Sequence, residues 1–218
     1  MINLLAQLAF GLLAMTICLP SMQEWGAIFQ VDQPAVQLTF SGFVLASGAL
    51  QLVYGPLSDR YGRKRILMTG LSVASAGSLL GIFAPDIATL TAARVLQGAG
   101  GAAGMVVGRA LVQDLFEGRQ RTRVMAYVGM TMGLVPPLAT LIGGQLHVHF
   151  GWRANFVVIA VLGFVLLLAA WRGLPAHRQG DAPDSHWLRA MLAEISSRGT
   201  ALRIRTRCRS TIFPSAMR

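Results

Sequence analysis

Six apolar segments of membrane-spanning length alternate with short polar stretches along the first 175 residues. The segments lie at about 3–20, 38–57, 66–84, 88–113, 124–146 and 154–171. A run of roughly 18 or more apolar residues with few charges is typical of a transmembrane helix. The pattern predicts an all-α integral membrane protein with six transmembrane helices. A first membrane helix is favoured over a cleaved signal peptide, because Pro20-Ser21-Met22 is not a small-residue cleavage site.

The cations between these segments predict how the chain is oriented. They gather in every second polar stretch, at Arg60, Arg63, Lys64, Arg65, Arg119, Arg121, Arg123, Arg172 and Arg178. The other polar stretches contain only Arg153. Because positive loops stay in the cytoplasm, both ends of the chain are predicted to be cytoplasmic in a bacterial inner membrane.

The composition agrees with a membrane protein and divides the chain in two. Of the 218 residues 54% are hydrophobic and 13% are charged, whereas a soluble domain has about 25% charged residues. The net charge is +10, and half of it lies in residues 176–218. We therefore expect a six-helix domain over 1–175 and a basic tail over 176–218.

The tail has no membrane periodicity and allows two interpretations. It is rich in Arg and Ser, with alternating arginines from Arg203 to Arg209. It could touch anionic lipid, or it could be translated out of frame, which we favour because a six-helix unit ends just before it. A nucleic-acid partner is not expected, because only the tail could offer a basic surface outside the membrane.

The most distinctive stretch is the basic turn at 55–65, with the sequence GPLSDRYGRKR. Gly55 and Gly62 allow close approach and turning. Pro56 and Asp59 are expected where one helix ends and the loop begins. A generic basic loop would be only a positive-inside anchor, but this ordered pattern is more specific.

An arginine lies inside the fourth segment. Burying Arg94 in a membrane costs on the order of 3 kcal/mol, so its side chain should face the bundle interior or water. Gln97 is one turn further along and points the same way. Gly100, Gly104 and Gly108 recur at intervals of four and predict close helix packing rather than a ligand site.

The fifth segment combines helix-breaking residues. Pro136 and Pro137 each remove a backbone hydrogen bond and predict a kinked helix. The neighbouring glycines are Gly133, Gly143 and Gly144. His147 and His149 follow in the expected outer loop, but two ligands without a third do not predict a metal site.

Several of these stretches resemble the major facilitator superfamily. The turn at 55–65 is similar to its loop between helices 2 and 3. Residues 94–98 (RVLQG) and the Pro–Gly set of the fifth segment resemble signatures of its drug:proton antiporter branch. The stretches 19–22, 36–39 and 109–114 further resemble the bicyclomycin and chloramphenicol resistance (Bcr/CflA) subfamily.

The resemblance implies the N-terminal half of a twelve-helix transporter, built of inverted three-helix repeats. It implies a conformational latch on the cytoplasmic side, formed by Gly55, Asp59, Arg60, Gly62, Arg63, Lys64, Arg65 and Asp114. It implies that Arg94 assists proton coupling, and that Gln51 and Gln97 line the substrate path. Gly133, Pro136, Pro137, Gly143 and Gly144 would form a bend that limits leak.

The resemblance also implies the energy source and leaves one position open. No cofactor is expected beyond the proton gradient, and the partners would be small drug-like molecules, protons and membrane lipid. Many relatives carry an acid in helix 1 near Pro20, where this chain has Met15-Thr16-Ile17-Cys18. The acid that would carry the proton is therefore not identified.

Three functions compete at this stage. The first is proton-coupled multidrug efflux by a half that needs a second half, either separately encoded or another copy. The second is a truncated or frame-shifted remnant that transports nothing, which the tail suggests. A membrane-embedded enzyme is weakly supported, because no Ser/His/Asp set or metal triad can be placed at one membrane depth.

Overall fold

The structure is a computed structural model that describes residues 2–173, all of them in helices or short turns. The helices are α1 (Ile2–Thr16), α2 (Met22–Phe29), α3 (Gln33–Tyr61), α4 (Arg63–Ile82), α5 (Ile87–Leu115), α6 (Gly118–Phe150) and α7 (Arg153–Gly173). The expected tail at 176–218 lies outside the described residues. Within these, the all-α expectation is confirmed.

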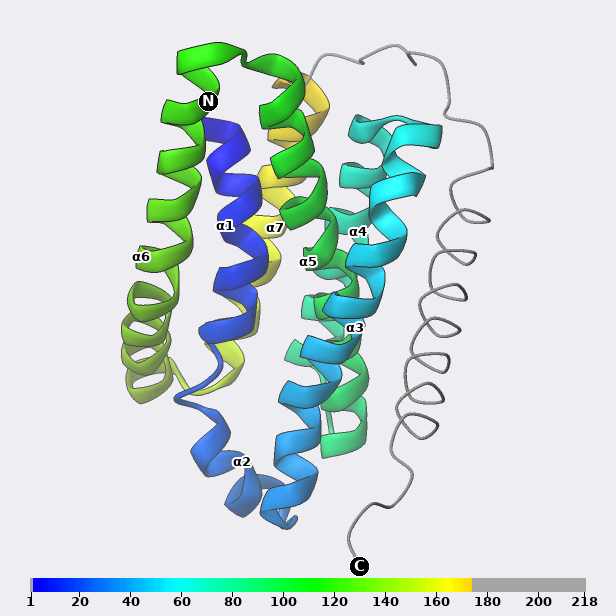
Figure 1. The fold of residues 1–218 in the computed structure, drawn as a ribbon. Helices are drawn as coiled ribbons and strands as arrows, with labels where there is room; N and C mark the ends of the chain where they lie inside the picture. Colours follow the sequence, from blue (N-terminus) through cyan, green and yellow to red (C-terminus); the bar gives the residue numbers. More distant parts are fainter. Residues whose placement is uncertain (1, 174–218) are drawn as a thin grey trace, which may run out of the picture. The chain divides into compact units, whose positions relative to one another are not determined.

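Six of the helices run alternately up and down, as Figure 1 shows, and the short α2 lies across one end. The α3–α4 and α5–α6 turns lie at the opposite end, with the start of α1 and the end of α7. We call this the basic end, because Arg60–Arg65 and Arg119–Arg123 lie there, and we call the other the α2 end. Helices α3 to α7 are long and apolar enough to cross a membrane, while α1 has 15 residues.

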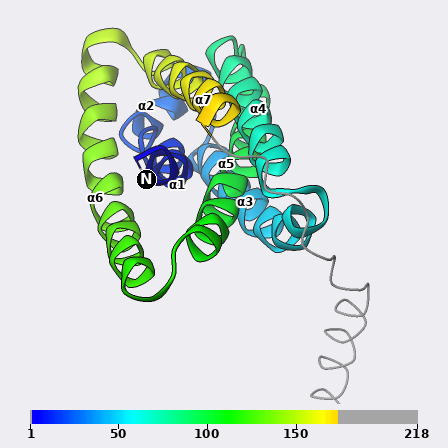
Figure 2. The same cartoon turned by 90° about the horizontal axis from the view of Figure 1, so that it is seen from above.

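Helix α5 lies at the centre and contacts α1, α3, α4 and α6. Figure 2 shows it between α3, α4 and α1 when the bundle is seen from above. Its glycines make this position possible. A methyl group on Gly100 would overlap the backbone of α4 at Gly70 and Ala74, and one on Gly104 would meet the carbonyl oxygen of Gln7 in α1. The predicted close packing is confirmed.

The turn into α5 is held by a side-chain cap. Asp86 accepts a hydrogen bond from the backbone N–H of Thr89 at 2.7 Å. This contact satisfies one of the free donors of the first helical turn and lowers the pKa of the Asp86 carboxyl group. Pro85 and Asp86 thus form the predicted turn between the third and fourth apolar segments.

The outer faces of α3 and α6 are the least covered parts of the bundle. Leu45 and Leu52 of α3 are 75% and 76% exposed, and Leu134 and Leu141 of α6 are 60% and 68% exposed. Apolar side chains can face lipid or another protein surface, so these faces fit a membrane protein and not a soluble one.

Two expectations about the first 37 residues are wrong. The first apolar segment was expected to be helical to Pro20, but α1 ends at Thr16 and the chain continues in turns. The following stretch was expected to be a loop, but it forms α2 because Trp25 is buried there and gives the short helix an apolar face.

The predicted loop at 55–65 is also wrong in extent. Helix α3 continues through Pro56 to Tyr61, and α4 begins at Arg63, so Gly62 alone lies between the helices. Its φ of 93° is accessible mainly to glycine, which explains the single-residue turn. Proline inside a membrane helix is tolerated because neighbouring helices, hydroxyl side chains or local adjustments satisfy the backbone groups that it frees.

The fifth segment is longer than expected. Helix α6 runs from Gly118 to Phe150 and continues without interruption through Pro136 and Pro137. The loop expected at 115–123 is therefore reduced to a short break before Gly118. His147 and His149 lie in the last helical turn and not in a loop.

The glycine packing of α5 gives a first prediction. Gly100→Ala should lower the free energy of unfolding by about 1–3 kcal/mol, the usual effect of overpacking a tight contact. Gly129→Ala is the matched control, because Gly129 is helical and has open space around it. Thermal unfolding of the purified protein, followed by circular dichroism, would compare the two. Equal stability of the variants would contradict the packing argument.

Candidate functional site: a buried arginine and an ion triad

The side chain of Arg94 in α5 is fully buried and contacts α1 and α3. Its Nη1 donates hydrogen bonds to the backbone oxygen of Ala14 at 2.7 Å and to Oε1 of Gln97 at 3.0 Å. Its Nη2 donates to the backbone oxygen of Met15 at 3.2 Å. The guanidinium also stacks over the ring of Phe43 of α3, 4.5 Å from its centroid.

Gln97 extends this network to α4. Its Nε2 donates to Oγ of Ser78 at 2.8 Å, and the Ser78 hydroxyl donates in turn to the backbone oxygen of Ala74 at 2.8 Å. Gln97 and Ser78 are both fully buried. The polar chain therefore links α1, α5 and α4 through the middle of the bundle. We call Arg94, Gln97 and Ser78 the central polar network.

The charge of Arg94 is balanced without a carboxylate. Within the described residues, no acidic side chain lies within ion-pair distance of it. Ala14 and Met15 belong to the last turn of α1, whose carbonyl groups have no partners within the helix. These carbonyls form the negative end of the helix dipole, so they favour a cation. Arg94 thus caps α1, and its Nε remains without a partner within the described chain.

A second charged group lies at the basic end. Arg63, the first residue of α4, places Nε 2.8 Å from Oδ2 of Asp114 in the last turn of α5. Its Nη2 lies 3.6 Å from Oδ1 of Asp59 in α3. The side chain of Arg63 is 19% exposed. This ion triad of Asp59, Arg63 and Asp114 ties the ends of three helices together.

The other predicted latch residues surround the triad without joining it. Arg60 lies over the ring of Tyr61 at 5.5 Å. Lys64 donates from Nζ to the backbone oxygen of Trp171 in α7 at 2.8 Å. Gly55 has open space around it, and Arg65 is exposed. Gly62 contributes the turn that places Arg63 next to Asp59.

The remaining predicted residues belong to α3 and α6 and do not form one cluster with the central polar network. Gln51 is partly buried, and its Nε2 donates to Ser47 Oγ at 3.4 Å and to Met105 Sδ at 3.9 Å. Gly143 packs against the backbone of Ile17, and Gly144 lies beside Pro20. Gly133 has open space around it.

A polar and aromatic cluster at the α2 end was not predicted. Trp25 of α2 packs on Trp152 and Phe156 at centroid distances of 6.2 and 6.4 Å. Nε2 of His147 lies 2.9 Å from Oε2 of Glu24. Nδ2 of Asn155 donates to Oγ of Ser21 at 2.9 Å, and both residues are fully buried. The tryptophans could have signalled this cluster, since each stands in a short polar stretch between apolar segments.

Comparison with known proteins identifies the family. A model of the Major Facilitator Superfamily matches residues 4–206. The chain belongs to this superfamily. Its members are transporters, so the enzyme alternative is set aside.

The relatives include drug-resistance proteins. The chain is 34% identical over 193 residues to multidrug resistance protein D of Escherichia coli K12, covering 86% of this chain and 48% of that protein. It is 36% identical over 152 residues to a bicyclomycin resistance protein homolog of Haemophilus influenzae, which covers 70% of this chain and 37% of that protein. It is 32% identical over 184 residues to a chloramphenicol resistance protein of Pseudomonas aeruginosa, which covers 83% of this chain and 43% of that protein. The chain thus spans about half the length of these relatives.

Solved structures agree on the fold. The peptide transporter POT, crystallised as an E310Q mutant with alafosfalin, superimposes with a TM-score of 0.71 at 16% identity. The match covers 93% of this chain and 44% of that chain. The described helices therefore form about half of a major facilitator fold, as the sequence predicted, and the protein is a multi-pass membrane protein.

The central polar network gives a second prediction. Gln97→Met keeps the side-chain length but leaves Arg94 Nη1 and the Ser78 hydroxyl each short of a partner. Unsatisfied buried groups should lower the free energy of unfolding by about 1–3 kcal/mol. Gln113→Met changes an exposed glutamine of the same helix and should have little effect. Thermal unfolding in detergent measures both, and equal melting temperatures would refute the importance of the network.

Proposed function

We propose that this chain is the N-terminal half of a proton-coupled efflux transporter for small drug-like molecules in a bacterial cytoplasmic membrane. The observation that supports this most directly is the fully buried Arg94, held by neutral acceptors of α1 and α5 inside the bundle. Charged residues inside a membrane bundle are expensive and usually functional. The similarity to named multidrug, bicyclomycin and chloramphenicol resistance proteins supports the substrate class.

We place the basic end in the cytoplasm and assign the ion triad the role of a latch. Asp59, Arg63 and Asp114 belong to α3, α4 and α5, so their contacts resist separation of these helix ends. A conformational change that moves α3 relative to α5 must break at least one of the two contacts with Arg63. The triad would therefore stabilise one state of the transport cycle.

Arg94 would assist proton coupling through the electrostatic effect of its buried charge. It is a fixed cation in a region of low dielectric, so it would favour an anionic group that enters its vicinity. All acids of the described chain lie at or near helix ends, so the acid that carries the proton is still unassigned. Gln51, which is partly exposed, would contact the substrate. Gln97 is fully buried and bonded to Arg94 and Ser78, so it would do so only in another state of the transport cycle. Helix α6 would bend at Pro136 and Pro137 and so limit leak.

A remnant that transports nothing is the second candidate. The chain spans about half of its relatives, and the outer faces of α3 and α6 expose apolar side chains. A pathway enclosed by two halves would have one wall missing. A second half, encoded separately or supplied by another copy, would complete it.

Drug resistance tests the efflux proposal. The 218-residue chain would be expressed in a drug-hypersensitive bacterium, alone and fused to the second half of E. coli multidrug resistance protein D. We expect resistance from the fusion, and drug addition to its proteoliposomes should move protons in a manner that a protonophore abolishes. Absence of resistance from both proteins would contradict the proposal. Resistance from the chain alone would refute the interpretation that it is a remnant without transport activity.

The latch gives a further prediction in the same fusion. Asp114→Asn should reduce the transport rate several-fold, because it removes the 2.8 Å contact with Arg63. Glu117→Gln is the matched control, since Glu117 is an exposed acid three residues further along with no recorded ion pair in the described chain. Unchanged transport in both Asp114→Asn and Asp59→Asn would rule out the latch role.

A further inference from the structure

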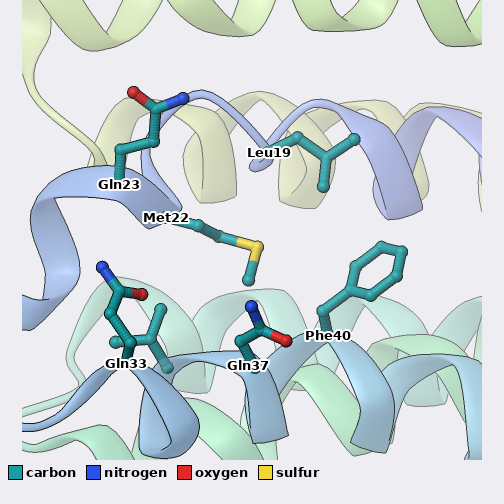
Figure 3. A pocket seen from close by; sticks show the side chains of 7 residues that line it. Leu19, Met22, Gln23, Gln33, Gln37 and Phe40 are labelled. Atoms are coloured by element: carbon teal, nitrogen blue, oxygen red, sulfur yellow. The ribbon is translucent and has the colours of Figure 1, made fainter.

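A pocket of about 370 Å³ opens at the α2 end, between the α1–α2 connection and the first turns of α3. Figure 3 shows its walls from close by. The lining residues are Leu19, Met22, Gln23, Gln33, Val36, Gln37 and Phe40. The volume falls within the range of small-molecule sites in proteins. The pocket is separate from the central polar network, which contributes none of its lining residues.

The polar part of this pocket is made of three carboxamides. Gln33 and Gln37 lie one helical turn apart on the same face of α3, and their carboxamides point toward the α1–α2 wall. Gln23 lines the pocket from α2, with its carboxamide directed away from the other two (Figure 3). Within the described chain none of the three carboxamide groups has a recorded hydrogen bond, so their donors and acceptors are available to a ligand. The lining contains no charged side chain.

The apolar part lies further along α3. Phe40 is one turn beyond Gln37, and Leu19 faces it from the α1–α2 connection, with Met22 between the two walls (Figure 3). The pocket is thus polar where α3 begins and apolar further toward the middle of the bundle. A methionine thioether is flexible and polarizable, which suits ligands of differing shape.

Contacts behind the pocket hold its α2 wall in place. Ser21 is bonded to Asn155, Glu24 is paired with His147, and Trp25 is packed into the aromatic cluster of α7. These residues flank Met22 and Gln23 in the sequence, so α2 is fixed on α6 and α7 while it faces α3. A site whose walls are fixed in advance loses less free energy on binding than one that must be ordered.

We propose that this pocket binds an uncharged amphiphilic small molecule, with an amide or hydroxyl group at Gln33 and Gln37 and an aromatic or aliphatic group against Phe40 and Leu19. The inference rests on the proposed efflux function for its substrate class. It adds a binding site at the α2 end, where a transported molecule would enter or leave. A permanently charged molecule would bind poorly, because the lining contains no counter-ion and its inner wall is apolar.

Equilibrium dialysis of the full 218-residue chain in nanodiscs tests this site without requiring transport. The probe is chloramphenicol, which is uncharged and combines an amide and hydroxyl groups with an aromatic ring. Tetraphenylphosphonium is the charged comparison. We expect saturable binding of chloramphenicol, weakened at least about tenfold in Gln33→Leu/Gln37→Leu, as the loss of two hydrogen bonds would produce. Gln113→Leu, an exposed glutamine of α5 at the basic end, should bind normally.

A second variant guards against misfolding as the explanation. Gln37→Glu keeps the shape of the side chain but adds a negative charge, and Gln37 is exposed, so the fold should tolerate it. It should weaken chloramphenicol and strengthen tetraphenylphosphonium binding. This reversal cannot arise from an unfolded protein.

Three results would overturn the inference. One is the absence of saturable chloramphenicol binding, and another is equal binding to the unaltered protein and both pocket variants. The third is weakened binding in Gln51→Leu with full binding in the pocket variants, which would place the ligand near the middle of α3 instead. That result would contradict the pocket inference but not the efflux proposal. Conversely, failure of the fusion to confer resistance would contradict the efflux proposal but not a ligand-binding pocket that dialysis had detected.

Discussion

The hydrogen bonds between the guanidinium of Arg94 and the last carbonyls of α1 are the contact on which the bundle depends. A cation inside a membrane protein must find acceptors, because no water is available to solvate it. Here the acceptors are backbone carbonyls that α1 itself cannot use. One side chain thereby satisfies the end of one helix and its own charge. Any displacement of α1 relative to α5 would leave the last carbonyls of α1 and the guanidinium of Arg94 without partners.

This contact requires short distances between helix axes, and the small residues of α5 provide them. Gly100 and Gly104 bring α4 and α1 close enough for Gln97 to reach Ser78 and for Arg94 to reach Ala14. The packing and the polar network therefore support each other. A larger residue on this face would push the helices apart and lengthen the hydrogen bonds. This coupling explains why a helix with a buried charge can also be the most buried span.

The sequence predicted the number, type and order of the long helices, because apolar length and the distribution of cations reflect the membrane directly. It also predicted that Arg94 faces the interior. The family resemblance implied that Asp114 belongs to the same latch as Arg63, and the two residues form an ion pair. It placed the helix ends poorly at Pro20, Pro56 and Gly118. Local rules assign helix ends to proline and charge. Helix α1 instead ends before Pro20, at Thr16, whereas α3 and α6 continue past such signals.

The partners within the site could not be predicted for a different reason. Ser78 contacts Gln97, and Phe43 contacts Arg94, because α4 and α3 are rotated about their axes so that these side chains face α5. A weakly amphipathic helix in a membrane does not reveal that rotation from its sequence, since apolar residues face both lipid and protein. The three glutamines of the pocket belong to this class, because their grouping depends on α2 folding back toward α3.

The short helix α2 connects these observations. It is anchored to α6 and α7 by the Trp25 cluster, by Ser21 with Asn155, and by Glu24 with His147. It also continues the chain from α1, whose end is held by Arg94. The position of one wall of the pocket is therefore set from two directions, by the α6–α7 turn and by the central polar network. The buried charge and the pocket at the α2 end are thus linked by a single continuous segment of the chain.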